Sequence, residues 1–98
     1  MWGFLLGALT AAGFMSSVKV VSTTVVVDEH QKKQIDEVLT IADTINFLGR
    51  TLPPDTDITA SVIELKARFD QIDGEAITDP VGRKNYNAVK AFFDANLG

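Results

Sequence analysis

Residues 58–72 read ITASVIELKARFDQI, and this stretch decides the fold that the sequence predicts. Its apolar residues recur every three or four positions, which places them on one face of an α-helix. We expect this helix over about residues 57–73, with Gly74 as its stop. The apolar face has to be covered, either inside a core or by a partner protein. The stripe consists of Ile58, Val62, Leu65, Phe69 and Ile72.

A second helix is predicted before this stretch, over about residues 29–50. Asp28 followed by Gln31 is typical of a capping box, in which the two side chains satisfy free amides of the first turn. The sequence LPPD at residues 52–55 ends the helix, because proline lacks an N–H and disfavours helical geometry just before it. The apolar face of this helix consists of Ile35, Val38, Ala42, Ile45 and Leu48.

A third helix is predicted over residues 80–97. Asp79 is a suitable cap, and Pro80 occupies the first helical position, where its missing N–H costs nothing. The three apolar faces can bury one another, so residues 28–98 are expected to form a small acidic helical domain, either a hairpin or a three-helix unit. The third face consists of Val81, Tyr86, Val89, Phe92, Phe93 and Leu97.

The N-terminal part of the chain, residues 1–27, differs sharply from the rest, because Lys19 is its only charged side chain. Residues 2–18 are uncharged and mostly apolar. Extended through Val27, the run would form a helix of about 39 Å at ~1.5 Å per residue. The hydrocarbon core of a bilayer is about 30 Å thick. We therefore expect an all-α protein in which residues 1–27 form a single transmembrane helix.

Lys19 and a set of small residues refine this prediction. Lys19 either marks the membrane interface, which limits the span to residues 2–18, or pairs with a carboxylate of another membrane subunit. Gly3, Gly7 and Ala11 recur at four-residue spacing and would let a second helix approach closely. These three residues are the predicted helix-packing positions within the membrane.

Three alternatives to the membrane helix stay open. A signal peptide normally begins with lysine or arginine, and neither precedes Lys19. A buried core helix followed by a strand is compatible with the β-branched residues of 18–27, which favour strands. Residues 18–27 are therefore either helix or strand. A segment that stays soluble until it inserts into a membrane is the third alternative.

The membrane interpretation also predicts an orientation. Lys19, Lys32 and Lys33 follow the apolar run, whereas its N-terminal flank contains no lysine or arginine. Positively charged flanks remain in the cytoplasm, so the helical domain is expected on the cytoplasmic side.

Composition and motifs argue against several kinds of chemistry. The chain has no cysteine and a formal net charge of −4, which disfavours a nucleic-acid-binding surface. His30 is the single histidine and has no converging set of metal ligands. The stretch from Asp70 resembles a calcium loop, but Ile72 and Gly74 occupy positions where oxygen ligands are required. We therefore expect no cofactor, no metal and no enzymatic activity.

The sequence thus favours a small membrane protein that serves as a structural, accessory or assembly subunit of a membrane-associated complex, for example in a bacteriophage particle. Its expected partners are the lipid bilayer and a protein partner or second copy, contacted through the membrane helix and the 58–72 stripe. One alternative is a membrane-active protein that oligomerises into a pore, as holins and ejection proteins do. Another is a soluble domain with a buried N-terminal helix and strand.

Overall fold

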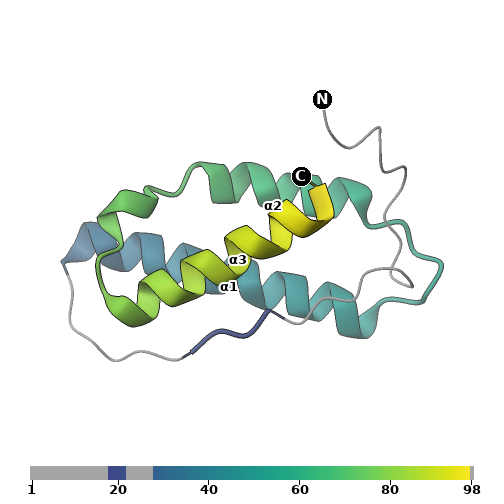
Figure 1. The fold of residues 1–98 in the computed structure, drawn as a ribbon. Coiled ribbons are helices and arrows are strands. Elements are labelled where there is room, and N and C mark those ends of the chain that lie inside the picture. Colours follow the sequence, from purple (N-terminus) through teal and green to yellow (C-terminus); the bar gives the residue numbers. More distant parts are fainter. Residues whose placement is uncertain (1–17, 22–27, 98) are drawn as a thin grey trace.

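The computed structural model describes residues 18–21 and 28–97. Within these residues the chain forms three α-helices and a short 3₁₀ helix (Figure 1). The prediction of an all-helical unit with three helices is confirmed for this part of the chain. The observed elements are α1 (Glu29–Thr51), α2 (Thr59–Asp70), the 3₁₀ helix η2 (Gly74–Ala76) and α3 (Pro80–Leu97).

The start of α1 follows the sequence signal only in part. The backbone N–H of Gln31 donates to the Asp28 side chain at 2.8 Å, as an N-cap requires. The Gln31 side chain does not complete a capping box, because its Oε1 accepts from the backbone N–H groups of Thr78 and Asp79. The expected reciprocal bond is therefore replaced by a contact with the start of α3.

The start of α2 lies two residues later than predicted, since Ile58 is its N-cap residue. The Asp57 carboxylate accepts a hydrogen bond of 3.0 Å from the Thr59 backbone N–H. This bond stabilises the ionised carboxylate and lowers the pKa of Asp57. At α3, the side chain of Asp79 accepts from the Gly82 backbone N–H at 2.9 Å, and Pro80 is the first helical residue as expected.

The core lies where the three apolar faces meet. All five residues of the 58–72 stripe are buried, so this face is core and is not available as a partner surface. The side chains that cover it come from α1 and α3, and Phe69 contacts Phe93 with ring centroids 5.4 Å apart. The buried residues of these two helices include Ile35, Val38, Ile41, Ala42, Ile45, Val89, Phe92, Phe93 and Leu97.

Helices α1 and α3 begin at the same end of the unit and run in the same direction, whereas α2 runs the opposite way (Figure 1). Gly82 marks the close approach of α3 to α1. A Cβ at this position would lie 3.0 Å from two side-chain carbons of Ile35 and 3.1 Å from Ile77. Glycine thus lets the first turn of α3 pack directly on α1.

Residues 18–21 are not helical and run as an extended stretch beside α1 (Figure 1). This finding differs from the expected apolar helix through Val27, which cannot be continuous across residues 18–21. Val18 is buried, Val20 is half-buried, and Lys19 and Val21 are exposed. Such alternation is typical of an extended chain with one face against a core.

The remaining membrane predictions fall elsewhere in the chain. Gly3, Gly7 and Ala11 lie outside the described residues, as does most of the predicted span. Among the helices of the described part, none is both long enough and apolar enough to cross a membrane.

Candidate functional site

The most specific polar contacts in the described part of the chain join residues 18–21 to the helical unit. On α1, the Asn46 side chain pairs with both backbone groups of Val18. The Val18 N–H donates to Asn46 Oδ1 at 2.9 Å, and Asn46 Nδ2 donates to the Val18 carbonyl at 3.0 Å. The amide side chain therefore pairs with this residue as a neighbouring strand would.

The same arrangement recurs on α3. The Val21 N–H donates to Asn85 Oδ1 at 2.8 Å, and Asn85 Nδ2 donates to the Val21 carbonyl at 2.9 Å. Asn85 has no exposed surface. Its side-chain amide is therefore removed from water. Because Oδ1 and Nδ2 both bond to the backbone of Val21, the cost of leaving them unpaired in the interior is avoided.

Asn46 and Asn85 together form what we call the asparagine clamp. Its hydrogen bonds are made to the main chain at Val18 and Val21, so they do not depend on which side chains these residues carry. Side-chain selectivity comes from the inward face, where Val18 joins the core and Val20 packs against it. The clamp therefore fits an extended segment with an apolar residue at every second position.

The extended geometry of residues 18–21 explains the exposure of Lys19. It lies between two inward-facing valines and its side chain is exposed. A charged residue is tolerated at this position because extended backbone directs alternate side chains away from the core. Within the described residues, Lys19 is a solvent-facing residue of a docked segment.

Sequence reasoning missed the clamp, although one signal for it was present. Asn85 lies four residues after Val81 and four before Val89, directly on the apolar face of α3. A polar residue at such a position has to find partners when it is buried. Asn46 gives no comparable signal in the sequence, because its position borders the apolar face of α1. In the structure it is half-buried.

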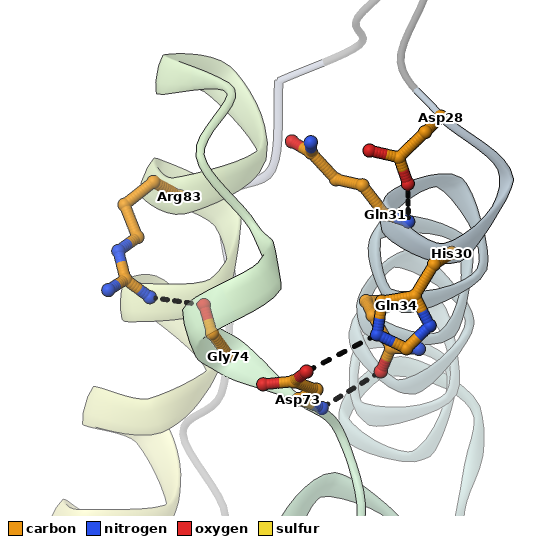
Figure 2. Close-up of polar contacts among 7 residues, drawn as sticks. All are labelled: Asp28, His30, Gln31, Gln34, Asp73, Gly74 and Arg83. Atoms are coloured by element: carbon orange, nitrogen blue, oxygen red, sulfur yellow. Dashed lines mark hydrogen bonds and ion pairs between the residues drawn. The ribbon is translucent and has the colours of Figure 1, made fainter.

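A second polar cluster lies at the end of the unit where α1 and α3 begin (Figure 2). His30 Nε2 lies 3.2 Å from Asp73 Oδ2, and the Asp73 N–H donates to Gln34 Oε1 at 2.9 Å. Arg83 donates to the Gly74 carbonyl at 2.9 Å. We call this set, with Asp28 and Gln31, the polar corner; it ties α1 to the connection between α2 and α3.

The polar corner is structural in character. The side chains of His30 and Asp73 are 62% and 55% exposed. A polar contact between side chains this exposed adds little to stability, because water competes for both partners. The stretch that resembles a calcium loop forms the end of α2, η2 and the cap of α3. Within residues 18–21 and 28–97, no three potential ligands among histidine, aspartate and glutamate are gathered for a metal ion.

One surface hollow, between α1 and α2, is lined largely by charged and amide side chains. Two of them, Arg68 and Glu37, form an ion pair across it. A binding pocket usually combines apolar walls with a few converging polar groups, and this hollow lacks that combination. The asparagine clamp, in which two amide side chains each pair with both backbone groups of one residue, has the most defined polar geometry.

Comparisons of the chain with protein-family models, with curated proteins and with solved structures found no match.

Proposed function

We propose that this protein is a non-enzymatic structural or accessory subunit, in which a membrane-inserted N-terminal segment holds the helical unit against a membrane-associated complex. One observation carries the proposal. The charge-free run of residues 1–17 leads directly into Val18, whose backbone is fixed to α1 by Asn46. Because Val18 follows the run without intervening residues, an inserted segment would position the helical unit closely at the bilayer surface.

The length of this segment supports a span at the short end of the usual range. If they form a helix, residues 1–17 would measure about 26 Å at ~1.5 Å per residue. A short span is accommodated when the bilayer thins locally or when several helices associate. Gly3, Gly7 and Ala11 would provide a surface for such association, because small residues allow close helix packing.

The partner contacts of this proposal differ from those expected from the sequence. The stripe of residues 58–72 is used inside the core, so a protein partner or second copy would be contacted through the membrane segment. The lysines after the run, Lys19, Lys32 and Lys33, favour a cytoplasmic helical unit.

A second candidate function rests on the burial of Val18. This residue is 7% exposed and belongs to the hydrophobic core of the helical unit. A soluble protein in which the N-terminal segment also folds onto the helices would place Val18 in the same way. Such a protein would bind its partners through the surface of the folded unit and would not require a membrane.

Alkaline carbonate washing of membranes that contain the full chain separates the two candidates. We expect the protein to remain with the lipid, as an inserted helix does. Leu9→Arg should release most of it, because arginine near the centre of a span costs about 2.5–3.5 kcal/mol on insertion scales. Circular dichroism of the released variant should still report the helical unit. Release of the unmodified chain would contradict the membrane proposal and favour the soluble one.

A further inference from the structure

The direction of residues 18–21 indicates where the N-terminal segment joins the helical unit. Gly82 packs on Ile35 near the starts of α3 and α1, and Asn85 lies about one turn after Gly82. Asn46 lies about three turns after Ile35. Because Asn85 holds Val21 and Asn46 holds Val18, the segment from Val21 to Val18 runs toward the C-terminal ends of α1 and α3. It covers about 10 Å of extended chain.

The end of the unit that the segment approaches differs from the other end in its surface. Phe47, in the last part of α1, is 56% exposed and is the most exposed large hydrophobic residue of the described chain. Pro53 and Pro54, just beyond α1, are also exposed, and Leu52 is half-buried. The opposite end is the polar corner, where the Gln34 side chain accepts from the Asp73 backbone N–H and the His30 imidazole lies 3.2 Å from the Asp73 carboxylate (Figure 2).

Basic side chains accompany the exposed apolar ones. Arg50 and Lys19 are both exposed, and Arg50 Nε donates to the Asn46 carbonyl at 3.3 Å. Exposed Phe or Leu side chains combined with lysine or arginine are a composition found where proteins contact the interfacial layer of a bilayer. We call this surface the Phe47 end; it consists of Lys19, Phe47, Arg50, Leu52, Pro53 and Pro54.

We infer that the Phe47 end lies against the lipid headgroup layer. The inference rests on the proposed function, because it is the insertion of residues 1–17 that brings this end to the bilayer. Phe47 then inserts its ring at headgroup level, and Arg50 and Lys19 extend toward lipid phosphates. The polar corner faces away from the membrane.

The charge of this region indicates what kind of bilayer it fits. Asp43, Asp55 and Asp57 are exposed near the Phe47 end and offset its two basic side chains. Because the net charge is not positive, anionic lipids gain no electrostatic advantage. We therefore expect contact with zwitterionic phosphatidylcholine bilayers, with no increase when anionic lipid is added.

Fluorescence quenching in vesicles tests this inference. Trp2 is the only tryptophan, so the full chain carrying Trp2→Phe accepts a single reporter. One variant adds Phe47→Trp, and its control adds Lys33→Trp, which lies on nearly the same face of α1 but about 21 Å closer to its start. With phosphatidylcholine spin-labelled at the headgroup, the reporter at position 47 should be quenched at least about twofold more than the one at 33.

The unmodified chain distinguishes failure of the inference from failure of the proposed function. Quenching of Trp2 by spin-labelled lipid, together with equal quenching at positions 47 and 33, overturns the inference and leaves the membrane proposal standing. An unquenched Trp2 overturns both. Stronger quenching at position 47 that requires anionic lipid contradicts the expected lipid preference.

Discussion

Replacing both asparagines of the clamp with alanine is expected to release residues 18–21 from the helical unit. The double variant Asn46→Ala, Asn85→Ala removes four hydrogen bonds to backbone groups. Each such bond contributes about 0.5–1.5 kcal/mol. Because Val21 is 44% exposed, water replaces part of the loss at that residue. The free energy of unfolding should therefore fall by about 2–4 kcal/mol, measured by urea titration of the full chain in mild detergent.

One control and one further variant separate loss of the clamp's hydrogen bonds from general damage to α3. Asn87→Ala changes a residue two positions further along the same helix that is not buried, and it should leave the urea midpoint nearly unchanged. Asn85→Asp keeps the shape and the acceptor but cannot donate to the Val21 carbonyl, so it should destabilise at least as much as alanine at this position. A urea midpoint that is the same in the double variant and the unmodified chain would show that the clamp does not hold the segment.

Truncation of Phe93 is expected to unfold the helical unit under mild conditions. Phe93 is 1% exposed and contacts the rings of Phe69 and Phe92, each at a centroid distance of 5.4 Å. Phe93→Ala removes these contacts and leaves a cavity, which costs about 3–5 kcal/mol. A core of this size rarely supplies more than about 3–5 kcal/mol in total. The variant should lose most of its helical circular dichroism at room temperature.

Phe47→Ala is the matched control for this prediction. It deletes the same side chain from an exposed position of α1. Substitutions at exposed positions usually change the free energy of unfolding by at most about 0.5 kcal/mol. Equal helical signal and equal urea midpoints for the two variants would contradict the core described here.

The helices could be predicted from the sequence because each has its own local signals. Pro80 after Asp79 placed the start of α3, and the two prolines after Leu52 placed the end of α1. The 58–72 stripe identified α2, although it could not distinguish a core face from a partner surface. That distinction depends on what the other helices cover, which is a property of the whole fold.

Residues 18–21 could not be predicted for a physical reason. An apolar run with one charge has the same composition whether it lies in lipid or against a protein core. The extended conformation at Val18 and Val21 is fixed by the side-chain amides of two asparagines. These asparagines lie 28 and 64 residues further along the chain, respectively. The role of the Gln31 side chain escaped prediction in the same way, since its partners Thr78 and Asp79 are also distant in sequence.

Hydrogen exchange at the backbone amides of Val18 and Val21 tests most directly whether this segment is docked on the helical unit. If the clamp holds, both amides of the unmodified full chain exchange at least about tenfold more slowly than in the double alanine variant, since tenfold corresponds to about 1.4 kcal/mol. If both amides of the unmodified chain exchange at the rate of an unstructured peptide, the extended segment, its direction and the placement of the Phe47 end are all wrong.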